Sequence, residues 1–262
     1  MNSFYVVPAV DTKGYLDYGQ ELAEKYGFPF CPRNGKTIRQ LQSILNSALL
    51  VAHAQGCYYV NGPDTLRYHM GLAPLRLKQI QKGKTEYLLE ALDLRGDESI
   101  IDATFGLGSD ALIMASFLQS ASGRIIGLES ADPVFYVVTE GLLHFKDHTG
   151  QISEESRRKI KLLHRDHHTY LSEQADRSVD VVFFDPMFQQ PVYGSDHLGG
   201  IRTFANADPL LGASIEEAIR VSRKKVVIKE RRDSILWSTW PIHKKVGGKY
   251  SNIAYGVIDC ER

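Results

Sequence analysis

The segment DATFGLGSDALIMA (Asp102–Ala115) places two carboxylates and two glycines where an apolar, strand-like run meets a helix-like run. Gly106 and Gly108 remove side chains at a point where the backbone must approach a ligand closely. Asp102 and Asp110 would be poor neighbours for a pyrophosphate but good neighbours for a cationic sulfonium or amino group. The segment therefore indicates a cofactor site, and its charge favours a cationic adenosine cofactor.

Acidic residues also follow the next two strand-like runs. A dinucleotide-binding GxGxxG motif would need a third glycine where Ala111 stands, so a dinucleotide dehydrogenase is disfavoured. Glu129 ends the second run, where a carboxylate that binds ribose hydroxyls is expected. Asp166 lies in HRDHHTYL after the third run, where it could meet an adenine amino group. The histidines of this segment are adjacent in a predicted loop and seldom converge on one ion in such a setting, so we expect no metal.

The fourth strand-like run ends in VVFFDPMFQQP, which delivers Asp185 to the same predicted crevice. The exocyclic amine of a nucleobase is planar, because its lone pair is delocalised into the ring. Its methylation needs acceptors that take its hydrogens and turn the lone pair toward an electrophile. Asp185 and the carbonyl of Pro186 could serve as these acceptors, and Phe188 could stack on a flipped base.

The composition limits the partners that the chain can have. The 262 residues are 43% hydrophobic, which fits one large domain or a main domain with an appendage. Lys plus Arg equals Asp plus Glu at 31 each, so any basic surface must be local. The three cysteines form no CxxC pair. The start lacks the pattern of a signal peptide and no apolar run is long enough to span a bilayer, so we expect a cytoplasmic protein with no membrane contact.

Short β-branched runs alternate with helix-length segments from residue 99 onward, which predicts a doubly wound α/β fold with a parallel sheet. The chain ends in two strand-like runs around Gly247 and Gly248, a predicted antiparallel hairpin. The first 80 residues predict a small α/β subdomain. We therefore divide the chain into residues 1–82, a subdomain expected to dock substrate, and residues 83–262, the cofactor-binding domain. The predicted strands of the second domain are 99–104, 124–129, 160–164, 179–185 and 224–229, and the predicted helices are 84–92, 110–118, 133–145 and 215–222.

With these motifs in place, the chain resembles class I S-adenosylmethionine-dependent methyltransferases. Within them it resembles the RsmJ family, which methylates guanine N2 in small-subunit ribosomal RNA. The resemblance rests on IDATFGLGSDALIMA, GLES, KLLHRDHHTYL, FFDPMF and KKVVIKERRD. It implies a Rossmann-like fold with a mostly parallel seven-stranded sheet. The cofactor contacts that it implies are Ser109, Asp110, Glu129, Ser130, Asp166, His167 and Asp185, and the glycine-containing motif itself adds Asp102, Gly106 and Gly108.

The expected reaction is therefore transfer of a methyl group from S-adenosyl-L-methionine to guanine N2 of ribosomal RNA, leaving S-adenosyl-L-homocysteine. Two alternatives stay open. One is an amine methyltransferase that acts on DNA or protein, and the other is a non-catalytic module that binds an adenosine cofactor.

Basic residues in two segments could bind the RNA backbone. The first segment, residues 66–84, precedes the cofactor-binding domain, and the second follows the fifth strand at the same sheet end as Asp185. The predicted RNA contacts are Arg76, Lys78, Lys82, Lys229, Arg231 and Arg232.

Overall fold

The computed structural model describes residues 4–186, 203–206 and 208–261, which form two compact units. The first unit comprises residues 4–69 and 136–146 with Thr203 and Phe204. The second comprises residues 70–135, 147–186, 205–206 and 208–261. The boundary near residue 70 lies upstream of the sequence-based division at 82, and the first unit also takes in a later helical segment. In the described part of the chain, no helix is long and apolar enough to cross a membrane.

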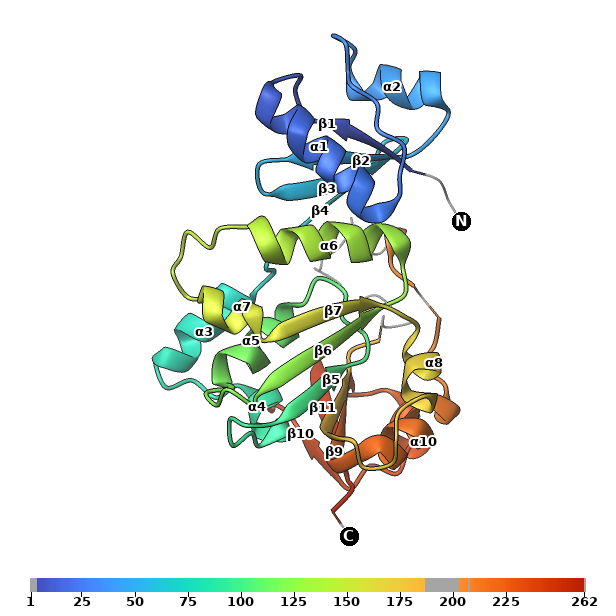
Figure 1. Cartoon of the computed structure of the whole chain (residues 1–262). Helices are drawn as coiled ribbons and strands as arrows, with labels where there is room; N and C mark the ends of the chain where they lie inside the picture. Colours follow the sequence, from blue (N-terminus) through green and yellow to red (C-terminus); the bar gives the residue numbers. More distant parts are fainter. Residues whose placement is uncertain (1–3, 187–202, 207, 262) are drawn as a thin grey trace. The chain divides into compact units, whose positions relative to one another are not determined.

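The first unit is built on a four-stranded sheet in the order β1-β2-β3-β4 (Figure 1). β1 and β2 are parallel, and the other neighbours are antiparallel. Thr37 caps the second helix of this unit with a reciprocal capping box to Gln40. The elements are β1 (Tyr5–Pro8), α1 (Lys13–Tyr26), α2 (Ile38–Leu45), β2 (Leu49–His53), β3 (Gly56–Asn61) and β4 (Asp64–Arg67).

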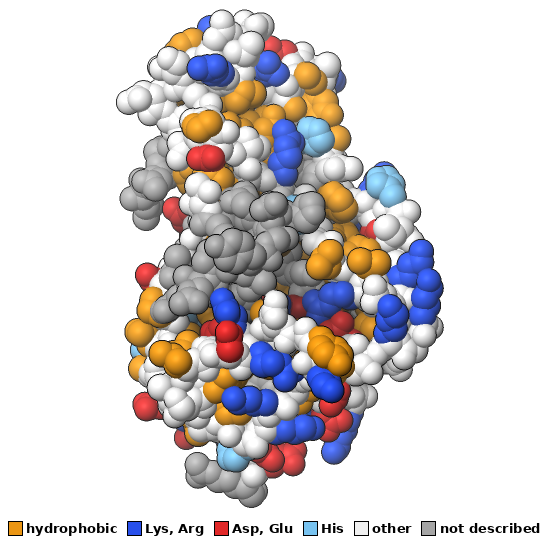
Figure 2. All heavy atoms as spheres, turned by 180° about the vertical axis from the view of Figure 1, so that it is seen from behind, with side chains coloured by type: hydrophobic (Ala, Val, Ile, Leu, Met, Phe, Trp, Pro, Cys, Tyr) orange, Lys and Arg blue, Asp and Glu red, His pale blue; other side chains and the backbone are white. Residues whose placement is uncertain are grey.

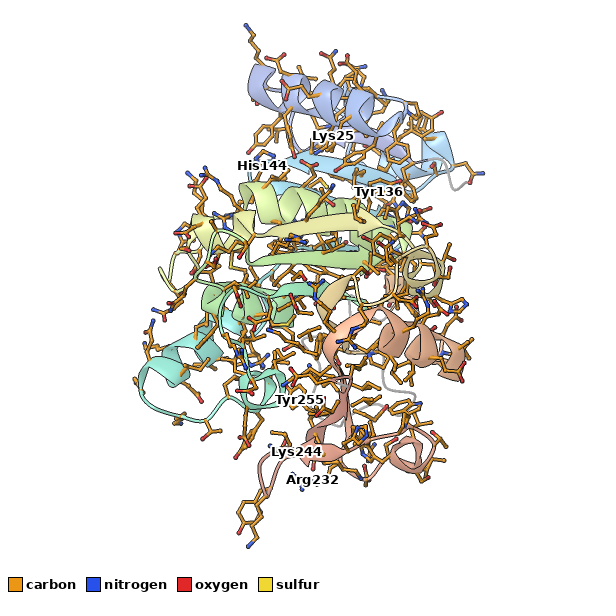
Figure 3. The ribbon with its side chains drawn as sticks, turned by 60° about the horizontal axis from the view of Figure 1, so that its bottom comes forward. Lys25, Tyr136, His144, Arg232, Lys244 and Tyr255 are labelled. Atoms are coloured by element: carbon orange, nitrogen blue, oxygen red, sulfur yellow. The ribbon has the colours of Figure 1, made fainter. Side chains whose placement is uncertain are left out.

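A buried carboxylate organises the interior of the first unit. Glu140 is 1% exposed and accepts hydrogen bonds from Tyr18 (2.8 Å), Tyr26 (2.6 Å) and Lys25 (2.7 Å). Burial opposes ionisation, but the donors from Lys25 and the two tyrosines together lower the pKa of Glu140. Figure 3 labels Lys25, Tyr136 and His144 of this unit. A charge this deeply buried is tolerated only when it is paired and hydrogen-bonded, as Glu140 is.

The second unit contains a seven-stranded sheet in the order β10-β11-β9-β8-β5-β6-β7. The five strands from β9 to β7 are parallel, and β11 and β10 add antiparallel pairs at one edge. This confirms the Rossmann-like fold with its C-terminal antiparallel hairpin. The strands are β5 (Ser99–Asp102), β6 (Arg124–Glu129), β7 (Ile160–His164), β8 (Val179–Phe184), β9 (Ser222–Arg231), β10 (Lys244–Val246) and β11 (Ile253–Asp259).

Helices pack beside this sheet, and α5 is apolar almost all round because it is buried. α8 and α10 contribute Leu171, Ile215 and Ala218 to a core that also contains Val182 and Phe184 of β8. The helices of this unit are α3 (Ala73–Gln81), α4 (Tyr87–Leu92), α5 (Ser109–Phe117), α7 (Glu154–Arg158), α8 (His167–Ser172), α10 (Gly212–Val221) and the short 3-10 helix η2 (Ile235–Ser238). A further helix, α6 (Asp132–His144), begins in this unit, and its residues from Tyr136 onward belong to the first unit.

The order of the strands determines where a ligand can bind. From β5 the chain moves outward through β6 and β7, and it then returns to the other side of β5 to form β8 and β9. The carboxyl ends of β5 and β8 therefore flank the point where the strand order reverses. Open α/β sheets bind ligands in the crevice beyond the strand ends at such a point. Asp102 ends β5 and Asp185 directly follows β8 at this position.

Most predicted elements are present with their ends shifted by one to three residues. One prediction was wrong: residues 167–172, expected as a loop of adjacent histidines, form α8. Asp166 caps this helix by accepting hydrogen bonds from the backbone and hydroxyl of Thr169. The helix is short, so its apolar periodicity is too weak to predict it.

We predict that Gly141→Ala destabilises the first unit. A Cβ at Gly141 would lie 2.1 Å from Cγ of Tyr68, whose ring is buried, so the ring would have to move. Overpacking of this kind costs about 1–3 kcal/mol of unfolding free energy. The matched control is Gly14→Ala in α1, where a Cβ meets nothing within 4 Å and alanine favours the helix. Urea unfolding should separate the two variants, and equal unfolding free energies would contradict the packing argument.

Candidate active site

The glycine-rich loop between β5 and α5 is folded around the ring of Phe105. Gly106 and Gly108 have φ values of 54° and 76°, in the left-handed region that favours glycine. A Cβ on Gly108 would lie 2.5 Å from the Phe105 ring, and one on Gly127 of β6 would lie 2.2 Å from it. The second glycine of the motif is thus required by internal packing as well as by backbone conformation.

Glu129 connects this loop to the end of β6. Its carboxylate accepts the N–H of Gly106 at 3.1 Å and the N–H of Ala131 at 2.8 Å. The side chain is buried, and burial raises the pKa of Glu129 to about 6 against the lowering effect of these backbone donors. The backbone N–H of Ser130 also stabilises the carboxylate. A carboxylate has about four acceptor sites, so this one keeps capacity for a ligand hydroxyl.

Asp102 is a buried carboxyl group with few partners. It is 2% exposed, and within the described residues it accepts one hydrogen bond, from the N–H of Thr104 at 3.3 Å. Burial and the nearby charge of Asp110 raise its pKa. A cationic ligand group beside it would compensate for both effects, because an opposite charge favours the ionised carboxylate.

A chain of alternating charges joins α4, α3, α5, β9 and the end of β8. The Arg76 guanidinium donates to both carboxylate oxygens of Glu86 (3.0 and 2.7 Å) and to Oδ1 of Asp110 (2.5 Å). Nζ of Lys229 donates to Oδ2 of Asp110 (2.8 Å) and to Oδ2 of Asp185 (2.7 Å). Both oxygens of Asp110 therefore already accept from cations of the protein itself.

The pKa shifts follow from this arrangement. Burial would raise the pKa of Asp110, but Lys229 and Arg76 lower it. At Asp185, burial raises the pKa, Lys229 lowers it and the charge of Asp110 raises it, and the net result is a raised pKa. Burial disfavours the ammonium of Lys229, yet Asp110 and Asp185 raise its pKa. Lys229 is therefore charged and holds the two carboxylates side by side.

Asp185 is also held through its backbone. Its N–H donates to Oγ1 of Thr104 at 2.5 Å. This hydrogen bond joins the end of β8 to the loop after β5. Asp185 and Pro186 are partly exposed, so their oxygen atoms border accessible space. The predicted base-stacking residue Phe188 lies outside the described residues.

The residues predicted near the adenine lie at the ends of β6 and β7. Asp166 caps α8, and its carboxylate is 45% exposed. The His167 ring meets the ring of Phe184 edge to face at 5.7 Å, and burial lowers the pKa of His167. Ser130 accepts a hydrogen bond from Asn206 at 3.3 Å. Ser109 is the first residue of α5, so its backbone N–H lies at a helix N-terminus.

The structure gives several predicted RNA contacts other partners. Arg76 and Lys229 belong to the charge chain, where their cationic groups already pair with carboxylates of the protein. Arg231 pairs with Asp233 at 2.9 Å, and Arg232 donates to the carbonyls of Gly248 and Ser251. Lys78 and Lys82 are exposed on and just after α3 and remain predicted RNA contacts.

Sequence reasoning missed two residues of this site. Glu86 fixes Arg76, and Tyr255, labelled in Figure 3, is 6% exposed and pairs in register with Lys229. Burial and the charge of Asp110 raise the pKa of Tyr255. The almost continuous apolar run of the last strand could have indicated that Tyr255 is buried, but only the strand order brings it to Lys229. Among the residues that the structure describes, no group of three or more His, Cys, Asp or Glu side chains could hold a metal ion.

We predict that Lys229→Met destabilises the protein by about 3–5 kcal/mol, because it leaves the buried carboxylate of Asp110 and the partly exposed carboxylate of Asp185 without their shared cation. The control is Lys225→Met on the same strand, where the partner Asp93 lies at 4.0 Å and is 89% exposed. That pair should contribute less than about 1 kcal/mol. The unfolding free energies from urea titrations provide the measurement, and a similar loss in both variants would rule out the special role of Lys229.

Comparison with known proteins places this geometry in a family. Residues 61–249 match the model of the family described as "Putative SAM-dependent methyltransferase". The uncharacterized protein YpiP of Bacillus subtilis is 32% identical over 80% of this chain and 82% of its own length.

Ribosomal RNA small subunit methyltransferase J of Mannheimia succiniciproducens is 30% identical over 56% of this chain and 58% of its own length. The enzyme of the same name from Acinetobacter baylyi is 36% identical over 41% of this chain and 38% of its own length. The chain thus spans a little more than half the length of the first of these relatives and less than half the length of the second.

A solved SAM-dependent methyltransferase from Neisseria gonorrhoeae superposes with a TM-score of 0.64, covering 98% of this chain and 96% of its own at 16% identity. This likeness supports the fold, and the family match, which covers most of the chain, supplies the cofactor class. The under-partnered Asp102, the open acceptor positions of Glu129 and the loop at the strand reversal fit S-adenosylmethionine. The chain belongs to the S-adenosylmethionine-dependent methyltransferase family.

Proposed function

We propose that this protein methylates the exocyclic N2 of a guanine in small-subunit ribosomal RNA. The observation that carries the proposal is the position of Asp185, which Lys229 and Thr104 hold at the carboxyl edge of the sheet, beside the cofactor loop. The names of the relatives from Mannheimia succiniciproducens and Acinetobacter baylyi support ribosomal RNA as the substrate class. These names give the class of substrate, and the choice of guanine N2 rests on the resemblance to the RsmJ family.

The residues at successive strand ends suggest how the cofactor is held. Asp102 would pair with the cationic methionine end, with Gly106, Gly108 and Ser109 forming the backbone around it, and Glu129 would accept the ribose hydroxyls. Ser130, Asp166 and His167 would border the adenine. Asp110 would contribute mainly through its charge, because Arg76 and Lys229 occupy its oxygens. When bound, S-adenosylmethionine supplies an already activated electrophilic methyl group.

The protein's part in the reaction is then orientation of the acceptor amine. The carboxylate of Asp185 and the carbonyl of Pro186 would accept the two N–H hydrogens, which turns the nitrogen lone pair toward the methyl carbon. As the nitrogen bonds to the methyl carbon, the carbon–sulfur bond would break and S-adenosyl-L-homocysteine would leave. The nitrogen would then give up one proton, which is acidic once the bond has formed, to Asp185 or water. Lys229 keeps Asp185 in place and, in the proposed arrangement, limits its rotation.

The first unit is proposed to dock substrate. It contains a cavity of about 270 Å³ lined by aromatic and imidazole side chains, among them Tyr15, Tyr18, His53 and His144. Such side chains suit unstacked bases, because every base has a face that can stack on a ring. The exposed Lys78 and Lys82 of the second unit could add phosphate contacts.

We predict that cofactor affinity depends on the ionisation of Glu129. Because burial raises the pKa of Glu129 to about 6, its charge-assisted acceptor bonds should be present above that pH and lost as the pH falls through it. Glu129→Ala should weaken binding by about 1.5–3 kcal/mol near neutral pH and abolish this pH dependence. Calorimetry between acid and neutral pH measures both effects. The exposed Glu155→Ala on α7 is the control and should behave as wild type, and an unchanged Glu129→Ala profile would remove Glu129 from the cofactor site.

The experiment that tests the function is mass mapping of methylated nucleotides in small-subunit ribosomal RNA from cells with and without the gene. Loss of one guanine N2 methylation, restored by the wild-type gene, is expected. Asp185→Ala should not restore it, although the purified variant should still fold. If no guanine changes, ribosomal RNA is not the substrate, and an amine in DNA or protein becomes the next candidate. Restoration by Asp185→Ala would contradict the role of Asp185.

A further inference from the structure

The loop between β10 and β11 has a composition unlike the rest of the chain. Residues 241–258 contain three lysines and no aspartate or glutamate, although the whole chain has no net charge. Lys244, Lys245 and Lys249 are all exposed. Figure 2 shows Lys and Arg side chains interspersed with hydrophobic ones in the lower part of the view. A local excess of positive charge of this kind attracts phosphates even when the protein is neutral overall.

An aromatic ring projects from the tip of this loop. The N–H of Ser251 donates to the carbonyl of Gly248 at 3.0 Å, which closes a turn with Lys249 and Tyr250 at its centre. Tyr250 is 89% exposed, the largest exposed fraction among the well-exposed large hydrophobic residues of the described chain. Nζ of Lys249 lies 5.5 Å from the centre of its ring. The turn thus presents a π-face beside a cation.

Contacts with Arg232 and Tyr87 hold the turn in place. The Arg232 guanidinium donates to the carbonyls of Gly248 and Ser251, the two ends of the turn, and the backbone N–H of Arg232 donates to Asn252 at 2.9 Å. Gly248 lies against the ring of Tyr87, so closely that a Cβ there would be 2.9 Å from it. Arg232 was also predicted to bind RNA, and in the structure its guanidinium donates to both ends of this turn. A braced turn loses little conformational entropy when it binds a partner.

The strand register places this turn at the catalytic edge of the sheet. β9 runs parallel to β8, and Ile228 pairs with Phe184, the residue before Asp185. β11 runs antiparallel to β9, and its first residue Ile253 pairs with Arg231 near the end of β9. The turn therefore lies at the same edge as Asp185. At about 4.8 Å between neighbouring strands, it is roughly 10–15 Å from β8 across the sheet.

We propose that this turn, with Lys249 and Tyr250 at its tip and Lys244 and Lys245 on β10, is a docking site for single-stranded RNA next to the target base. The proposal rests on the proposed RNA substrate and adds the surface that holds it. Tyr250 stacks on an unpaired base, and the lysines contact the neighbouring phosphates. Lys244 and Lys245 follow one another on β10 and so project from its two faces, on either side of the edge that carries the turn. Lysines around an exposed ring are the combination that binds single strands with little regard to sequence. Tyr250 is separate from the groups that hold Asp185, so its removal leaves the site intact.

The test measures binding of a fluorescently labelled single-stranded RNA of about 16 nucleotides by anisotropy over a range of salt concentrations. Tyr250→Ala should weaken binding about tenfold, and Tyr250→Phe should restore it, since the ring and not the hydroxyl stacks. Lys249→Glu should weaken binding and lower the slope of log affinity against log salt by about 0.7 for each phosphate that the variant no longer neutralises. The control is Lys161→Glu, an exposed lysine on β7 at the opposite edge of the sheet. It should leave RNA affinity close to that of wild type.

The outcomes separate this proposal from the function on which it rests. If wild type binds the RNA and the Tyr250 and Lys249 variants bind equally well, the docking surface is wrong and the RNA substrate stands. If wild type binds neither this RNA nor deproteinised small-subunit ribosomal RNA, the RNA substrate itself fails. Binding to anionic phospholipid vesicles that Tyr250→Ala abolishes, without RNA binding, would replace RNA by a lipid surface. Calorimetry with S-adenosylmethionine should give the wild-type affinity for every variant.

Discussion

The candidate site depends on one buried ammonium group, that of Lys229. Asp102, Asp110 and Asp185 converge where β5, α5 and β8 meet, and Asp102 and Asp110 are almost completely buried. Two like charges about 4 Å apart repel by about 4 kcal/mol at the effective dielectric constant of a protein surface. Lys229 replaces this repulsion with two ion pairs of 2.8 and 2.7 Å, and Arg76 adds a third to the same Asp110. The carboxylates can lie together only because β9 and α3 supply these cations.

The cations also divide the carboxylates into two classes. Asp110 is paired with two protein cations and is held ionised, so it fixes geometry and local charge. Asp102 and Glu129 have raised pKa values and unused acceptor positions, so they can respond to a cationic or hydroxyl-bearing ligand. Asp185 lies between these two classes. One of its carboxylate oxygens accepts from Lys229, and its backbone N–H donates to Thr104. The acidic residues look alike in the sequence, but some of them fix the geometry of the site and others have capacity to bind a ligand.

Sequence patterns were sufficient for the parts of the structure that local chemistry determines. β6 and β7 were predicted to the residue, because short β-branched runs bounded by charged or turn residues are typical of buried strands. The strand ends then placed Asp102, Glu129 and Asp185 at one edge. The ion pairs were not predictable, since they join residues far apart in the chain: Lys229 is 119 positions from Asp110 and 44 from Asp185. Composition alone suggested that Arg76, Lys229 and Arg232 were free for RNA, whereas their partners come from tertiary structure.

The antiparallel strand β11 has a consequence that an all-parallel sheet could not provide. In a parallel strand the preceding loop lies at the amino edge of the sheet, away from the ligand crevice. Because β11 runs against β9, the loop that precedes it reaches the carboxyl edge, and Arg232 at the end of β9 can brace it. The same reversal pairs Tyr255 with Lys229 and covers the charge chain with a buried ring. One change of strand direction thus shields the site that holds Asp185 and also brings a basic, aromatic turn to the edge where that site opens.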